Sequence, residues 1–187
     1  MPFNLPNLLT WLRILLIPLF VGIFYFSVFH QNLYATIIFT VAALTDWLDG
    51  WLARKLNQTS AFGEFLDPVA DKLMVAAALV VLVQLARVDA IIALIIIGRE
   101  ITVSALREWM AKIGASQSVA VSFLGKVKTL SQMIAIPLLL YHDQIGAFST
   151  QRVGTWLIYI AAVLTLISMA YYIKVALPQA WRHGSAS

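Results

Sequence analysis

The chain has 187 residues, of which 61% are hydrophobic and only 12% charged, and its formal net charge is +4. Soluble domains carry about 25% charged residues, and a chain of this length has no interior large enough for so much apolar material. The composition therefore predicts an integral membrane protein. The absence of cysteine excludes disulfides, thiolate metal sites and a cysteine nucleophile. No run of consecutive basic residues indicates nucleic acid as a partner.

Six stretches are apolar and long enough to cross the hydrocarbon core as helices, which takes about 20 residues each. In chain order they are Leu8–Phe29, Leu33–Arg54, Asp67–Ala86, Ala90–Met110, Val119–Tyr141 and Val153–Ala176. The connections are short, and no linker separates two domains. We expect an all-α membrane domain of six transmembrane helices over residues 1–182, with a tail or cloning remnant at 183–187.

The distribution of basic residues predicts the orientation in the membrane. An even number of spans places both termini on one side, and the side rich in Lys and Arg faces the cytoplasm. The basic residues near that face are Arg54, Lys55, Lys72, Arg107, Lys112, Lys126, Lys128, Lys174 and Arg182, whereas Arg87 and Arg152 lie near the other. Both termini are therefore expected in the cytoplasm.

Charged residues inside membrane helices are costly and indicate function. The second stretch ends with Asp46 and Asp49, and at 100° per residue these aspartates share one arc of a helix with Gly50 and Ala53. Two carboxylates and two small residues therefore occupy one face.

The third stretch carries a matching set. Gly63, Asp67 and Asp71 follow one another at a spacing of four, so a helix stacks them on one face. Pro68 is compatible with a first helical turn, with Asp67 as the cap, or with a kink in a helix that begins near Ser60. The glycine spacing favours the longer, kinked helix.

Four carboxylates on adjacent helices repel one another unless some are protonated or cations bind. Oxygen ligands suit Mg²⁺, Mn²⁺ or Ca²⁺, and two bridged metals are a recurring device for phosphoryl transfer. Simple pairing of the aspartates with Arg54, Lys55 and Lys72 is the structural alternative. A cation transporter is the alternative from another class, but its carboxylates would lie near the bilayer midplane. Here they lie at a helix end beside basic residues, which suits a phosphate-bearing substrate.

The whole pattern is Asp46-x-x-Asp49-Gly50-x-x-Ala53-Arg54, then eight residues, then Gly63-x-x-x-Asp67-x-x-x-Asp71. It resembles the signature of the CDP-alcohol phosphotransferases at every motif position. Further segments resemble the bacterial branch of the family that uses CDP-diacylglycerol and sn-glycerol 3-phosphate. These segments are Asn4–Arg13, Arg99-Glu100, Ser104–Trp109 and Gly125–Thr129.

The resemblance implies transfer of a phosphatidyl group to sn-glycerol 3-phosphate, with CMP and phosphatidylglycerol phosphate as products. It implies that two divalent cations, Mg²⁺ or Mn²⁺, are held by Asp46, Asp49, Asp67 and Asp71, and that Asp71 is also the general base. It implies a homodimer in the bacterial inner (cytoplasmic) membrane, with the active site toward the cytoplasm. The residues expected to contact the nucleotide or the CDP-lipid are Asn7, Thr10, Gly50, Ala53, Arg54, Ser60 and Gly63.

Glycerol 3-phosphate is a dianion near neutral pH, so its site needs fixed cations. Arg107, Lys126 and Lys128 lie on segments predicted to face the cytoplasm, and we expect them to bind the acceptor phosphate. Ordinary positive-inside topology is the alternative explanation for these three residues. Arg99 and Glu100 could pair structurally or support the site, and structural pairing is the expectation for Glu100. Acceptors that would keep the same chemistry are inositol phosphate, serine and phosphatidylglycerol.

Overall fold

The computed structural model describes residues 5–26, 28–56, 61–113 and 123–184, and within these ranges the side chains of 5–7, 47, 49–56, 61–64, 123–124, 175 and 177–184 lie outside the description. Six long helices follow one another in this part of the chain. They are α1 (Leu5–Tyr25), α2 (Gln31–Leu56), α3 (Ala61–Gln84), α4 (Ala90–Lys112), α5 (Phe123–Tyr141) and α6 (Thr150–Gly184). The predicted all-α class is confirmed.

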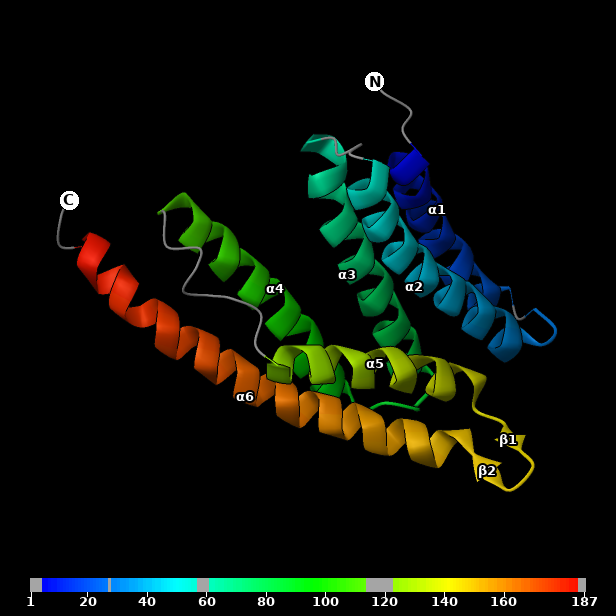
Figure 1. The fold of residues 1–187 in the computed structure, drawn as a ribbon. Coiled ribbons are helices and arrows are strands. Elements are labelled where there is room, and N and C mark those ends of the chain that lie inside the picture. Colours follow the sequence, from blue (N-terminus) through cyan, green and yellow to red (C-terminus); the bar gives the residue numbers. More distant parts are fainter. Residues whose placement is uncertain (1–4, 27, 57–60, 114–122, 185–187) are drawn as a thin grey trace.

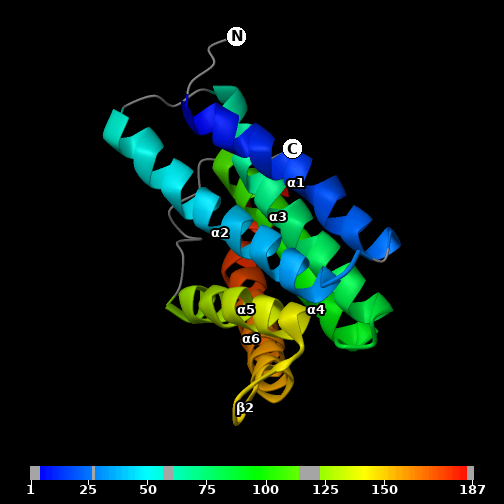
Figure 2. The same cartoon turned by 90° about the vertical axis from the view of Figure 1, so that its right-hand side faces the viewer.

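The helices pack in two groups that meet where α5 contacts α2 and α3 and where α4 contacts α3. Helices α1, α2 and α3 contact one another, while α6 packs along both α4 and α5. Helix α5 crosses the lower ends of α2 and α3 (Figures 1 and 2). The core between the groups is built from large apolar side chains such as Phe20, Phe39, Leu82 and Ile136. A smaller core of Val103, Met110, Tyr172 and Ala176 joins the ends of α4 and α6.

The alternation of helix direction creates two faces, which are named here by what they carry. On the aspartate face α1 begins, α2 ends, α3 begins and α4 and α6 end (upper side in Figure 1). On the hairpin face lie the α1–α2 and α3–α4 connections and the hairpin between α5 and α6 (Figure 1). The start of α1 and the end of α6 therefore lie on the same side of the molecule, as an even number of helices of alternating direction requires.

Helix α3 settles the alternatives raised by Pro68. The helix begins at Ala61 and contains Pro68 inside it, so Asp67 is not its cap. The longer helix favoured by the glycine spacing is confirmed. Helix α4, by contrast, has a clear side-chain cap, because Asp89 accepts a hydrogen bond of 2.8 Å from the backbone N–H of Ile91.

The predicted boundaries differ from the observed ones mainly at α6. This helix begins at Thr150 and continues through Gly184, well past Ala176 and into the first two residues of the predicted tail. Hydropathy marks the part of a helix that suits lipid, whereas backbone hydrogen bonding extends the helix beyond it. The connection before α6 also contains two short antiparallel strands, β1 (Gln144–Ile145) and β2 (Phe148–Ser149), which the sequence did not indicate.

Three connections on the hairpin face contain a non-glycine residue in the left-handed backbone region. His30, Ala86 and His142 have φ values of 57°, 55° and 59°. Each follows or precedes a helix end, where a left-handed residue terminates or redirects the helix. A side chain at such a φ is disfavoured relative to glycine, so all three turns carry local strain.

Many large apolar side chains face outward from the helices. Leu15, Ile91, Leu94 and Trp156 are each more than 60% exposed. Within the described residues, two helices are long and apolar enough to cross a membrane, over Leu8–Tyr25 of α1 and Thr150–Lys174 of α6. These outward apolar surfaces indicate that the protein is associated with a membrane.

Candidate active site

Three of the four predicted aspartates have described side chains, and they come from two adjacent helices. Asp46 lies in the C-terminal half of α2, and Asp67 and Asp71 lie in the first half of α3. Asp46 is within electrostatic range of both Asp67 and Asp71. The structure thus places Asp46 near Asp67 and near Asp71, toward the aspartate face, and the three residues are called the carboxylate group here.

Helix α1 contributes the partners of this group. The hydroxyl of Thr10 donates a hydrogen bond to Oδ1 of Asp67, and the guanidinium of Arg13 donates to Oδ1 of Asp46 at 2.6 Å. Thr10 and Arg13 are both only 1% exposed. A buried guanidinium and a buried hydroxyl therefore fix one oxygen of each of two carboxylates.

Several predicted site residues cannot be placed by their side chains. Asp49, Gly50, Ala53 and Arg54 belong to α2, Gly63 belongs to α3, and Asn7 belongs to α1. Their side chains lie outside the described part of the chain, and Ser60 lies outside it altogether. Of the predicted nucleotide-binding residues only Thr10 is described, and its observed partner is Asp67.

The donor chemistry of the carboxylate group fits hard divalent cations, which prefer carboxylate oxygens. Among the described side chains, no three Asp, Glu, His or Cys residues converge as a ready metal site. The fourth motif aspartate, Asp49, is not among those side chains. Two described carboxylates on adjacent helices, each with one oxygen fixed by α1, form a framework that could hold a cation.

Asp71 borders a small cavity of about 10 Å³. The residues around it come from α1, α2, α3 and α5, and they are Arg13, Phe39, Ala42, Ala43, Asp71, Met74, Val75 and Met133. A space of this size holds at most about one water molecule. The carboxylate of Asp71 therefore lies against a largely apolar wall, with Arg13 as the charged group on the same cavity.

A second group of charges lies where α4, α5 and α6 meet, and it is called the cationic cluster here. It consists of Arg99, Arg107 and Lys128 around Glu100 and Tyr172. Glu100 Oε1 accepts from Arg99 at 3.2 Å and also from Lys128. Arg107 donates to the hydroxyl of Tyr172 at 2.9 Å, and the Arg99 and Arg107 guanidiniums lie 5.6 and 5.2 Å from the centre of its ring.

The predicted acceptor residues are only partly brought together. Arg107 and Lys128 are close enough to interact electrostatically, and both belong to the cationic cluster. Lys126 lies on the exposed side of α5. Residues two apart on a helix point in nearly opposite directions, so Lys126 and Lys128 cannot share one face. The predicted structural pairing of Arg99 with Glu100 is confirmed.

Two residues that organise these groups, Arg13 and Tyr172, had no role predicted from the sequence. Arg13 is an arginine within an otherwise apolar helix, and that isolation was a usable signal for a buried partner. Tyr172 gave no such signal, because an aromatic residue in an apolar stretch is common in membrane helices.

The two groups of charges adjoin. Asp71 is within electrostatic range of Asp46 and Arg13 and also of Glu100. Helices α3 and α4 pack against each other, which places the helix that carries Asp71 beside the helix that carries Glu100. The carboxylate group and the cationic cluster therefore adjoin at Asp71.

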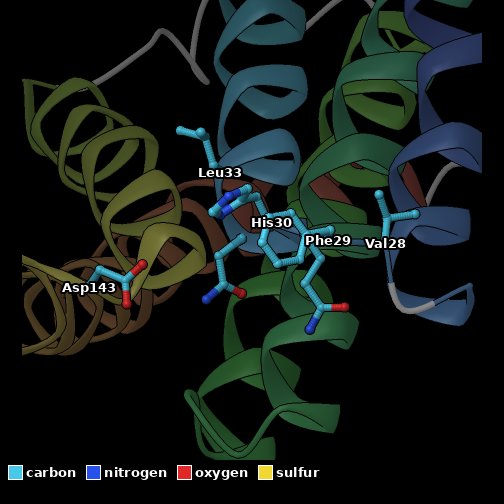
Figure 3. Close-up of a pocket in the computed structure, with 7 residues that line it drawn as sticks. Val28, Phe29, His30, Leu33 and Asp143 are labelled. Carbon is cyan, nitrogen blue, oxygen red and sulfur yellow. The ribbon is translucent and has the colours of Figure 1, made fainter.

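A larger cavity, of about 420 Å³, lies on the hairpin face and contains no predicted site residue (Figure 3). It is lined by Val28, Phe29, His30, Gln31, Asn32, Leu33 and Asp143. Beside it, Arg87 donates to Oδ1 of Asn32 at 2.9 Å and to the carbonyl of Leu140 at 2.7 Å. Arg87 thus joins the start of α2 to the end of α5, which is a structural role.

Comparison with known proteins adds independent evidence. Residues 3–167 match the family model of CDP-alcohol phosphatidyltransferase. A protein from Shigella flexneri named CDP-diacylglycerol–glycerol-3-phosphate 3-phosphatidyltransferase is 50% identical over 178 residues, which cover 94% of this chain and 96% of that protein. A protein of the same name from Escherichia coli is 49% identical over the same shares of the two chains.

Proposed function

The chain belongs to the CDP-alcohol phosphatidyltransferase family, and we propose that it is an enzyme that transfers the phosphatidyl group of CDP-diacylglycerol to sn-glycerol 3-phosphate. The products are phosphatidylglycerol phosphate and CMP, which places the enzyme in phospholipid biosynthesis. One observation of the structure carries the proposal most directly. Asp71 lies within electrostatic range of Asp46 in the carboxylate group and of Glu100 in the cationic cluster.

The reaction forms one bond between the acceptor hydroxyl oxygen and the phosphorus of the lipid-linked phosphate. It breaks the bond from that phosphorus to the oxygen that leaves with CMP. Asp71 accepts the proton of the attacking hydroxyl, because it is within electrostatic range of both groups that would hold the two substrates. Arg107 and Lys128, which lie together in the cationic cluster, are the proposed contacts of the acceptor phosphate, whereas Lys126 lies on the opposite side of α5.

The motif aspartates Asp46, Asp49, Asp67 and Asp71 are the residues that would hold two divalent cations, Mg²⁺ or Mn²⁺. When bound, such ions neutralise the diphosphate and stabilise negative charge on the leaving CMP. Thr10 and Arg13 orient Asp67 and Asp46 from α1. The nucleotide is proposed to lie over the small residues Gly50, Ala53 and Gly63, with polar contacts from Asn7, Thr10, Arg54 and Ser60.

The arrangement in the membrane completes the proposal. All six helices span the bilayer of a bacterial inner membrane, with both termini and the aspartate face toward the cytoplasm. Soluble glycerol 3-phosphate then reaches the cationic cluster from the cytoplasm, and the CDP-lipid enters sideways from the bilayer. The protein is expected to form a homodimer. The start of α1 and the end of α6 lie on the same side of the molecule, which supports the placement of both termini on one side of the membrane (Figure 1).

The test is CMP release by the purified protein in detergent with CDP-diacylglycerol and Mg²⁺ or Mn²⁺. Candidate acceptors are added one at a time: sn-glycerol 3-phosphate, inositol phosphate, serine and phosphatidylglycerol. We expect release only with both metal and glycerol 3-phosphate. Release with a different acceptor would keep the chemistry and change the substrate, whereas folded protein without release would contradict the proposed function.

A further inference from the structure

Lys128 is one of the three cations expected to bind the acceptor phosphate, yet in this structure it is almost inaccessible. Its side chain is 2% exposed and its amino group is paired with Glu100. Arg99, which donates to the same carboxylate oxygen at 3.2 Å, is 7% exposed. Both cations that would bind an incoming phosphate are therefore already paired with the Glu100 carboxylate.

Glu100 is the accessible member of this arrangement. Its side chain is 24% exposed, more than three times the exposure of either cation to which it is bonded. Of these three side chains, Glu100 is therefore the most accessible to an incoming anion. An anion that binds Arg99 and Lys128 where Glu100 now binds them must take the place of its carboxylate.

From this geometry we infer that Glu100 is an internal occupant of the acceptor phosphate site and that the phosphate displaces it on binding. The inference rests on the proposed function and specifies how its acceptor site chooses a substrate. A carboxylate carries one negative charge, whereas a phosphomonoester is largely a dianion with three terminal oxygens near neutral pH. The phosphate can replace both contacts of Glu100 and also reach Arg107, which lies in the same cluster.

The exchange gives the site a selection rule. An alcohol without a phosphate offers Arg99 and Lys128 nothing that compensates for the loss of the carboxylate, so it leaves Glu100 in place. A phosphorylated alcohol of suitable size displaces it. Glu100 is accordingly a specificity-determining residue that acts through Lys128 and Arg99.

The test is the steady-state kinetics of Glu100→Gln, with KM measured separately for glycerol 3-phosphate and for CDP-diacylglycerol. Glutamine keeps the shape of the side chain but competes poorly for cations. We expect KM for glycerol 3-phosphate to fall at least about threefold, because a charge-assisted hydrogen bond that competed with the phosphate is lost. KM for the CDP-lipid should stay within about twofold of the wild-type value.

Glu108→Gln is the matched control. It makes the same substitution on the same helix, in an exposed pair with Lys112 whose side chains are 70% and 72% exposed. Both KM values should remain at wild type. A KM for glycerol 3-phosphate that is unchanged or higher in Glu100→Gln would overturn the inference.

Glu100→Asp covers the case in which the glutamine variant does not fold. Aspartate keeps the charge but withdraws the carboxylate by one methylene, so it should lower the acceptor KM in the same direction and by a smaller factor. An unchanged or raised acceptor KM in this variant would also overturn the inference.

A separate measurement distinguishes this inference from the proposed function. Inorganic phosphate should raise the melting temperature of Glu100→Gln at lower concentrations than it does for wild type and Glu108→Gln. If no acceptor supports CMP release but this difference is found, the proposed function fails and the anion exchange stands. If CMP release is normal and the difference is absent, the anion exchange fails alone.

Discussion

Asp71 is the residue on which the proposed chemistry depends most, because it lies where the carboxylate group meets the cationic cluster. Asp71→Asn retains the shape of the side chain but cannot accept a proton from the acceptor hydroxyl. We expect CMP release to fall at least about 100-fold, the usual contribution of a general base. The rate is measured with purified protein at saturating substrates.

Asp143→Asn is the control for that experiment. It makes the same change on the hairpin face, whereas the carboxylate group lies toward the opposite, aspartate face. It should retain the wild-type rate. Both variants should melt cooperatively, which shows that the fold is intact. An Asp71→Asn enzyme with the wild-type rate would show that another group accepts the proton.

Arg13 supports the carboxylate group from α1, and its removal should destabilise the protein. Arg13→Met leaves Asp46 without a guanidinium that is 1% exposed and bonded at 2.6 Å. Asp46 itself is 39% exposed, so water compensates in part, and we expect a loss of about 1–3 kcal/mol. Thermal melts in detergent and chelator would measure it.

Lys112→Met provides the comparison, because the Lys112–Glu108 pair is exposed on both sides. Such pairs contribute little, so its melting temperature should match that of wild type. Equal melting temperatures for Arg13→Met and wild type would mean that the Arg13–Asp46 contact does not stabilise the fold.

At the residue scale, the sequence could predict the aspartates but not their partners. Carboxylates spaced by three or four residues within apolar stretches identify a shared helix face without any knowledge of the fold. The pairing of Arg13 with Asp46 joins residues 33 positions apart, which local spacing does not encode. The sequence groups Lys126 with Lys128 because both lie on a segment predicted to face the cytoplasm, whereas in α5, which is helical from Phe123, the two side chains point in nearly opposite directions.

At the scale of elements, α5 and α6 are in tight contact at Gly154. A Cβ added there would lie 2.8 Å from Cγ of Leu139 and 3.2 Å from Cβ of Leu138. Gly154→Ala should therefore force the two helices apart and lower stability by about 1–3 kcal/mol. The measurement is the melting temperature in detergent.

Gly98→Ala is the matched substitution, because a Cβ at this position in α4 meets no atom within 4 Å. Alanine favours the helix over glycine, so this variant should melt at the wild-type temperature or above it. A Gly154→Ala protein as stable as Gly98→Ala would mean that α5 and α6 can separate without loss.

The number and order of helices could be read from the sequence, because long apolar stretches are separated by short polar connections. The lengths of the helices could not be read from the sequence. Hydropathy ended the last helix at Ala176, but α6 continues through Gly184 since hydrogen bonding does not require apolar side chains. The packing of α5 across α2 and α3 was also beyond the sequence, because every helix has several apolar sides that could face a neighbour.

At the scale of the whole molecule, the absence of cysteine offers a direct test of orientation. Lys112→Cys marks the end of α4 on the aspartate face, and Ala147→Cys marks the exposed hairpin between β1 and β2. In sealed inside-out membrane vesicles, an impermeant maleimide should label Lys112→Cys and not Ala147→Cys. In intact spheroplasts the labelling should reverse.

Permeabilised membranes are the control, and both variants should then react. Labelling of Lys112→Cys in spheroplasts would invert the proposed orientation. Labelling of both variants from the same side would contradict an odd number of membrane passes between them.

The three left-handed residues on the hairpin face also affect how the protein could be engineered. His30, Ala86 and His142 each hold a backbone angle that glycine adopts without steric penalty, and none lies in the carboxylate group or the cationic cluster. Ala86→Gly should raise the melting temperature, since relief of the φ strain, about 1 kcal/mol, exceeds the added freedom of the unfolded chain. Substitutions on the hairpin face, opposite the carboxylate group, should therefore yield a more stable enzyme whose turnover is unchanged.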